Sequence, residues 1–390
     1  MRSAPPPPII KGWCPGALRP MQSGDGLVVR VRPHGGCLSR AQIAGLAELA
    51  QAHGNGLVDF SARANLQLRG IRPEGHAAVL GGLNALGLLD PDPETESARN
   101  IMVTPFWQSG DGTITLARAL ETRLGHAVTH EGLRLPGKFG FSVDCAGSPV
   151  LRQASADIRL ERTPSGALLL YPDGADKGRL VEDHEAAEQA VTLANWFVRS
   201  GGTCNGRGRM AAHVRRTPLP PGYDVAVPDL PPFVARPGPT PGGWMAGLAF
   251  GQCTAATLSA LATMAPLRLT PWRMIVAEGL SEPPSLVDLL PADDPLLRVT
   301  ACTGAPACPQ ALAPVRTLAT DLAPHVPAHT FLHVSGCAKG CAYPQASPLT
   351  LVAQPEGFAL IRHGTTTDQP IACNLSAELL RTHPELMAKD

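Results

Sequence analysis

The chain is poor in lysine, in aromatic residues and in long apolar runs. Lysine occupies only five of the 33 basic positions, and aromatic residues make up 4% of the sequence. The 33 basic residues balance 33 acidic ones, so no overall field favours nucleic acid or an anionic membrane. No run approaches the about 18 apolar residues of a transmembrane helix. We therefore expect a protein without nucleic-acid or membrane partners.

The sequence also lacks the signs of a secreted protein. Ten cysteines among 390 residues are too sparse for a disulfide scaffold, and six of them are scattered. Residues 1–11 contain four consecutive prolines and no apolar signal-peptide core, and we expect them to form an extended leader. These features favour a reducing compartment, so we expect a cytoplasmic location.

The chain does have four cysteines in two close pairs. Cys302 and Cys308 form C-x5-C, and after an interval of 28 residues Cys337 and Cys341 form C-x3-C. Four thiolates suit a [4Fe–4S] cluster, because each iron requires one sulfur ligand from the protein. Glycines in and beside both pairs allow the backbone to approach a bulky cluster, and a short apolar run before each pair predicts a buried strand.

Two other interpretations of these cysteines remain open. Structural zinc sites place about two to four residues between paired ligands, so C-x3-C fits zinc and C-x5-C fits it loosely. Isolated buried thiols without any metal are the other alternative.

A weak internal repeat flanks a proline-rich segment. GGCLSRAQIAGLAELA, from Gly35, has a counterpart in FGQCTAATLSALATMA, from Phe250, and DFSARANLQLRGI is echoed by LRLTPWRMIV. Each copy predicts a turn, a helix and then a strand that carries an arginine, Arg63 or Arg273. Prolines crowd residues 218–243, which we interpret as a linker. The repeat predicts a duplicated, pseudo-twofold α+β protein with ligands between its halves.

Three further segments place cations in apolar, strand-like runs. They are SARANLQLRGI, ARNIMVTPF and LPGKFGFSVD, and they contain Arg63, Arg69, Arg99 and Lys138. A half-buried cation is costly unless it meets an anion, so the set together indicates an anionic ligand. The alternative is a group of ordinary surface cations at strand ends.

The cysteine pairs, in the settings TACTGAPACPQ and HVSGCAKGCAYP, resemble the cluster motif of the sulfite and nitrite reductase superfamily. The resemblance implies two ferredoxin-like halves, 12–89 and 244–291, alternating with two α+β domains, 90–217 and 292–390, the last of which carries the cluster. The segment 218–243 would link the halves. Arg63 and Gln67 match the family's T-x-R-Q-x-x-Q segment, Arg99 and Asn100 its R-N-[VI] segment, and Lys138 its P-x-K-F segment, which hold siroheme and the bound anion.

One departure from this pattern changes the expected activity. Where many of these reductases carry a second lysine, the chain has Gly140, and TPWRM around Arg273 looks more like the precorrin-3B synthase branch of the superfamily. In that branch a reduced tetrapyrrole is the substrate and takes the place of siroheme. The resemblance implies an O2-dependent monooxygenase of aerobic cobalamin biosynthesis, which hydroxylates precorrin-3A at C20 while a γ-lactone forms.

The same resemblance implies a set of cofactors, partners and binding residues. A mononuclear non-heme iron would accompany the [4Fe–4S] cluster, and an external electron donor, NADH-linked or ferredoxin-type, would supply electrons. The substrate would be held by seven side chains: Arg63, Gln67, Arg69, Arg99, Asn100, Lys138 and Arg273. Ligands of the mononuclear iron leave no readable motif. His333 lies on a predicted apolar strand and is expected to be a hydrogen-bonded core histidine.

Two other functions remain open at this point. One is a siroheme-dependent sulfite or nitrite reductase, in which Cys341 would also bridge to the siroheme iron. The other is a non-catalytic iron–sulfur electron carrier or tetrapyrrole-binding protein.

Overall fold

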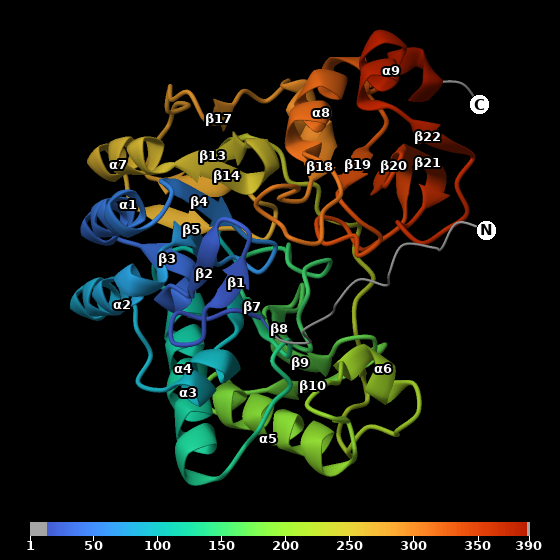
Figure 1. Cartoon of the computed structure of the whole chain (residues 1–390). Coiled ribbons are helices and arrows are strands. Elements are labelled where there is room, and N and C mark those ends of the chain that lie inside the picture. Colours follow the sequence, from blue (N-terminus) through green and yellow to red (C-terminus); the bar gives the residue numbers. More distant parts are fainter. Residues whose placement is uncertain (1–13, 388–390) are drawn as a thin grey trace.

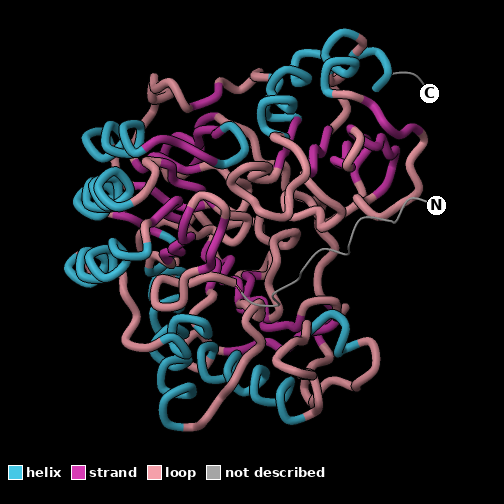
Figure 2. Tube along the Cα trace, in the orientation of Figure 1, coloured by secondary structure: helices cyan, strands magenta, loops and turns pink. Residues whose placement is uncertain are grey.

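The computed structural model describes residues 14–387, in which helices surround four β-sheets (Figure 1). Figure 2 shows most helices at the periphery, with strands and loops between them. The predicted leader, residues 1–11, lies outside the described residues. Within the described range no helix combines the length and apolar character needed to cross a membrane.

Two sheets form the ferredoxin-like halves. Their strand orders are β1-β2-β5-β4-β14 and β12-β13-β16-β15-β3, and β17 pairs with β13. The strands are β1 (Met21–Ser23), β2 (Gly26–Val31), β3 (Cys37–Leu38), β4 (Leu57–Phe60), β5 (Leu66–Ile71), β12 (Gly238–Thr240), β13 (Gly243–Leu248), β14 (Gln252–Thr254), β15 (Leu267–Leu269), β16 (Ile275–Glu278) and β17 (Leu289–Leu290). Helices α1 (Arg40–His53), α2 (His76–Ala85) and α7 (Ala255–Met264) lie along one side of these sheets (Figure 1).

The two halves exchange one strand each. β14, from the second half, pairs with β4, and β3, from the first half, pairs with β15. The exchanged strands begin at equivalent turns, because Gly35 and Phe250 both adopt a left-handed conformation, with φ of 61° and 56°. Each strand then leads into a capped helix, α1 behind Ser39 and α7 behind Thr254. The structure therefore has the duplicated, pseudo-twofold α+β fold expected from the sequence.

Two further sheets repeat a second pattern. In the first, β6, β7 and β8 are parallel and β8 to β11 antiparallel; in the second, β18, β19 and β20 are parallel and β20 to β22 antiparallel. The first contains β6 (Ile101–Val103), β7 (Phe141–Asp144), β8 (Ile158–Arg162), β9 (Leu168–Pro172), β10 (Lys177–Val181) and β11 (Val225–Ala226), with α3 (Pro93–Ala98), α4 (Thr113–His130), α5 (Ala186–Arg199) and α6 (Met210–Val214). The second contains β18 (Val299–Ala301), β19 (Leu332–Ser335), β20 (Ser347–Gln354), β21 (Gly357–Gly364) and β22 (Ala372–Leu375), with α8 (Val315–Leu322) and α9 (Ala377–Thr382).

Three apolar cores hold these layers together. One joins both ferredoxin-like halves, and one lies within each α+β unit. The amphipathic pattern of α1 shows how the sequence directs this packing, because Ile43, Leu46, Ala47 and Ala50 form its buried face. The proline-rich segment 218–243 supplies two edge strands, β11 and β12, where a missing N–H is tolerated.

The arginines of the repeat lie in turns, not on strands as the sequence predicted. The Ser61 hydroxyl accepts backbone N–H groups from Arg63 and Asn65, and the Thr270 hydroxyl closes the equivalent turn before β16. These hydroxyl bonds end the preceding strand. Aligning the two hydroxyls pairs Arg63 with Trp272, so the two arginines of the repeat differ by one position.

Candidate functional site

The four paired cysteines lie on two loops that leave the same edge of a sheet. Cys302 follows β18 and Cys337 comes two residues after β19, and these strands are parallel neighbours with Ala301 beside Val334. Parallel strands in register end at one edge, so the fold brings the two loops together. The Gly336 N–H donates to Cys302 Sγ at 3.2 Å, which links the two cysteine pairs directly.

Gly336 is required where the loops meet. A Cβ at this position would lie 2.7 Å from Ala311 Cβ and 3.4 Å from Cys302 Sγ. The Gly336 carbonyl also accepts from the Leu312 N–H at 2.8 Å. Any side chain here would push the cysteine loops apart, which explains the glycine beside the second pair.

The thiols of the four cysteines lie within one another's electrostatic field. Burial raises the pKa of Cys302, and the neighbouring Cys308 and Cys337 raise it further. Burial raises the pKa of Cys341 in the same way, with the other three cysteines adding to the shift and Lys339 opposing it. Four mutually repelling thiolates need a shared positive centre, so this donor set fits an iron–sulfur cluster.

A [4Fe–4S] cluster and one zinc ion would require different arrangements of these sulfurs. Within residues 14–387, no three histidine, cysteine or acidic side chains converge on a position for a single metal ion. A tetrahedral zinc with bonds of about 2.3 Å would draw its sulfurs to about 4 Å apart. A [4Fe–4S] cluster gives each cysteine its own iron and does not require that convergence.

Arg273 fastens the cysteine loops to the second ferredoxin-like half. Its Nη1 donates to Thr300 Oγ1 at 2.6 Å, and its Nη2 donates to the Ala342 carbonyl at 2.7 Å. Thr300 precedes Cys302 by two residues, and Ala342 directly follows Cys341. The guanidinium thus bonds to protein atoms beside the paired cysteines, whereas the sequence predicted a contact with substrate carboxylates.

Two of the predicted substrate cations already have carboxylate partners. Arg69 pairs with Asp25 at 3.0 Å, and Arg99 forms a buried pair with Asp90 at 2.7 Å. Arg99 also lies 3.6 Å from Glu121. Folding therefore brings acidic partners to Arg69 and Arg99, so the burial of these two cations does not require an anionic ligand.

Three other predicted residues, Arg63, Gln67 and Lys138, gather around a site that lacks such partners. With its amide turned to present oxygen, Gln67 accepts from Arg30 Nη2 at 2.7 Å and Nε at 3.1 Å. Arg63 Nη2 donates to Ser155 Oγ at 3.0 Å. The Nη1 atoms of Arg30 and Arg63 are buried without a hydrogen-bond partner among the described residues. Exposed Lys138 forms no ion pair with a described carboxylate.

Cys14 shows where these cations converge. Burial raises the pKa of its thiol, but Arg30, Arg63 and Lys138 outweigh burial and hold the pKa below its ordinary value. Three cations that together stabilise one thiolate would stabilise a carboxylate in the same place. We define Arg30, Arg63, Gln67, Lys138 and Cys14 as the cation site.

Arg30, Cys14 and Arg209 also belong to this region, although no sequence motif marks them as binding residues. Arg209 pairs with Asp157 at 2.9 Å and also donates to Ser155 Oγ at 3.1 Å, beside Arg63. The readable signal for Arg30 was its position in an apolar strand, the same criterion that selected Arg63. In the second half, β13 places Met245 at the position equivalent to Arg30, so only the first half carries this cation.

Gly140 occupies a position with no room for a lysine. A Cβ there would lie 2.5 Å from Asn100 Nδ2 and 3.0 Å from the Asn100 carbonyl. Asn100 Nδ2 is held by the Phe139 carbonyl at 2.9 Å, so it cannot easily move away. Asn100 thus has a structural role besides its predicted substrate contact. Its packing against Gly140 leaves no room for a second lysine at that position.

His333 is not the hydrogen-bonded core histidine that the sequence predicted. Its side chain is fully buried, and neither ring nitrogen has a partner among residues 14–387. Burial, with the nearby Arg273, lowers its pKa to about 4, so the ring is neutral. Its register neighbours are Thr300 and Thr350, and the Tyr343 ring lies 6.1 Å away.

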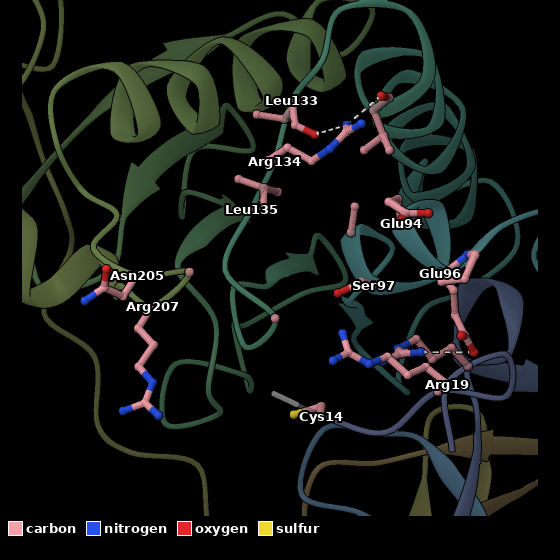
Figure 3. A pocket seen from close by; sticks show the side chains of 17 residues that line it. Cys14, Arg19, Glu94, Glu96, Ser97, Leu133, Arg134, Leu135, Asn205 and Arg207 are labelled. Carbon is pink, nitrogen blue, oxygen red and sulfur yellow. Dashed lines mark hydrogen bonds and ion pairs between the residues drawn. The ribbon is translucent and has the colours of Figure 1, made fainter. Parts of the chain in front are cut away.

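A cavity of about 370 Å³ opens beside the cation site. Figure 3 shows Asn205 and Arg207 on one wall, Ser97 and Arg19 opposite them, and Cys14 between. Glu96 also faces the cavity, where Arg32 Nη1 pairs with it at 3.3 Å. Cationic and amide groups therefore line a solvent-facing path toward Cys14.

Comparisons with known proteins first define the class. Residues 19–86 match the nitrite/sulfite reductase ferredoxin-like half domain. The solved structure of the NirA protein of Mycobacterium tuberculosis shares the fold, with a TM-score of 0.64 over 92% of this chain and 79% of that chain, at 19% identity. A ferredoxin–nitrite reductase of Leptolyngbya laminosa is 29% identical over 34% of this chain and 27% of its own length.

The family follows from a similarity that spans nearly the whole chain. A precorrin-3B synthase of Sinorhizobium sp. is 30% identical over 93% of this chain and 85% of its own length. The chain belongs to the precorrin-3B synthase family, and it is an enzyme of the oxidoreductase class.

Proposed function

We propose that this enzyme converts precorrin-3A to precorrin-3B, by O2-dependent hydroxylation at C20 with γ-lactone formation in aerobic cobalamin biosynthesis. The observation that carries the proposal is the similarity to a precorrin-3B synthase along 93% of the chain, against 34% for a nitrite reductase. Gly140, packed against Asn100, adds support, because no second lysine could enter the site to bind sulfite or nitrite.

The cation site would hold the substrate through its carboxylates. Arg30 and Arg63 each present a buried nitrogen without a described partner, and Lys138 adds an exposed ammonium at the surface. Charge-assisted hydrogen bonds from such donors are about twice as strong as neutral ones. Gln67 keeps Arg30 in place by accepting two of its N–H groups, so the guanidinium is oriented before the substrate arrives.

The proposed cofactors are a [4Fe–4S] cluster on Cys302, Cys308, Cys337 and Cys341 and a mononuclear non-heme iron. When bound, the cluster would relay electrons and the iron would activate O2. One oxygen atom enters the product and the other leaves as water, so two electrons and two protons must come from an external donor. Arg273 would keep the cysteine loops at a fixed place relative to the ferredoxin-like half that it anchors.

The test begins with protein purified without oxygen. Iron and sulfide content, the optical spectrum and an acid–acetone extract for tetrapyrrole would be measured, followed by O2 consumption with precorrin-3A and a reductant. We expect about four sulfides and about five irons per chain, four in the cluster and one mononuclear, with no siroheme and a product heavier by one oxygen atom. Stoichiometric siroheme with sulfite or nitrite turnover would instead identify a reductase, and bound cluster without turnover would identify a carrier.

A further inference from the structure

One stretch of the chain carries charge of a single sign. Between Glu188 and Asp224 there is no acidic residue, whereas arginine occurs five times, at 199, 207, 209, 215 and 216. The whole chain has zero net charge, so its overall field cannot attract an anion. A local concentration of positive charge can do so.

The fold gathers these arginines on one lobe. Arg199 ends α5, and Arg215 and Arg216 directly follow α6. The end of α5 is joined to α6 by Ser200 Oγ and His213 Nε2, 2.7 Å apart. Arg199, Arg215 and Arg216 are exposed, and none pairs with a carboxylate in the described part of the chain.

Two other arginines of this segment lie beside the cation site. Arg209 and Arg63 donate to the same Ser155 hydroxyl, at 3.1 and 3.0 Å. Arg207 belongs to the same segment and lines the cavity that reaches Cys14 (Figure 3). Two acids share that cavity, exposed Glu94 and the paired Glu96, so the arginines outnumber the acids along the path.

We propose that residues 199–216 form the surface to which a carboxylate-rich tetrapyrrole binds first, before it moves into the cation site. This inference rests on the proposed function, because that substrate carries the carboxylates. Arg199, Arg215 and Arg216 act at long range, since they lie outside the buried cation site and pair with no carboxylate in the described part of the chain. They therefore raise the association rate and contribute little to the bound complex.

The experiment measures binding of precorrin-3A to the anaerobic holoenzyme by stopped-flow absorbance. Without O2 the substrate binds but is not turned over. We would compare wild type with a triple variant, R199Q/R215Q/R216Q, which removes three charges, and with R199K/R215K/R216K, which keeps them. R118Q removes one exposed arginine from α4 and serves as a control for charge loss elsewhere.

At about 10 mM salt, where the Debye length is about 30 Å, the glutamine variant should associate about tenfold more slowly. Its dissociation rate should be unchanged, and the difference should vanish near 1 M salt. The lysine variant and R118Q should behave like wild type.

Three results would overturn this assignment. They are an association rate of the glutamine variant equal to wild type at low salt, an equal loss in the lysine variant, or a change confined to dissociation. If wild type binds and turns over precorrin-3A and the glutamine variant associates as fast as wild type, only the role of residues 199–216 is refuted. If wild type binds no precorrin-3A, the proposed function is refuted as well.

Discussion

Replacing Arg273 with methionine should loosen the cysteine loops, which are proposed to hold the cluster, without unfolding the protein. The guanidinium joins Thr300, ahead of Cys302, to the Ala342 carbonyl, behind Cys341, at 2.6 and 2.7 Å. Hydrogen bonds from a charged donor contribute about 1.5–3 kcal/mol each. The same guanidinium is buried beside Arg316, and burial lowers its pKa, so removing the charge recovers part of that loss.

The net effect should be about 2 kcal/mol in favour of open loops, which corresponds to about 30-fold in the opening equilibrium. The assay is the rate at which the brown chromophore disappears when an iron chelator is added under anaerobic conditions. Cluster loss should be about 30-fold faster in R273M. T300V, which removes only one of the two contacts, should fall between R273M and wild type.

Arg298 provides a matched control. It also donates from a guanidinium to a backbone carbonyl, Val326 at 3.1 Å, in the same α+β unit but outside the cysteine loops. R298M should lower thermal stability but leave the rate of cluster loss close to that of wild type. Equal rates of cluster loss in R273M and R298M would refute the anchoring role of Arg273.

Four further changes test separate parts of the site. Cys308→Ser should abolish the brown chromophore, and a wild-type spectrum would disprove the cluster assignment. Lys138→Ala should weaken precorrin-3A binding while iron content stays constant; unchanged affinity would show that Lys138 does not bind the substrate. Gly140→Lys should lower Tm, because its Cβ would lie 2.5 Å from an amide nitrogen; equal Tm would contradict that packing. Burial raises the pKa of Asp144 to about 6 in the folded state, above its ordinary value, so the folded state holds the proton more tightly than the unfolded state. The free energy of unfolding should therefore fall as pH rises from about 4 to about 6, and this fall should be smaller in Asp144→Asn.

Much of the fold could be predicted because its signals are local. The capped, amphipathic pattern of α1 and the turn residues of the β20–β21 hairpin are both readable from short windows. The strand exchange was not readable, since β3 and β14 have only two and three residues and their partners lie more than 190 residues away. Strands that short carry no periodicity of their own.

The candidate site divides in the same way. Cysteine spacing is a local signal, so the two loops could be predicted to meet. Pairing between charges that are distant in sequence leaves no local signal. Arg69 is therefore predicted to bind substrate, although its guanidinium pairs with Asp25, 44 residues earlier. Asp90 is only nine residues before Arg99, but nothing in that spacing shows that α3 brings the two together. The isolation of His333 follows from tertiary packing and leaves no sequence signal.

The exchange of β3 and β14 has an evolutionary consequence. A polypeptide containing one ferredoxin-like half would leave a sheet edge open, so a single-repeat ancestor would have closed it by dimerising through swapped strands. Once two copies were fused in one chain, each could change its sequence independently of the other. One copy carries Arg30 and Arg32, while the other has Met245 and Gly247 at the equivalent positions. The fused chain can therefore carry the cation site in one half alone, while both halves keep the strand exchange that holds them together.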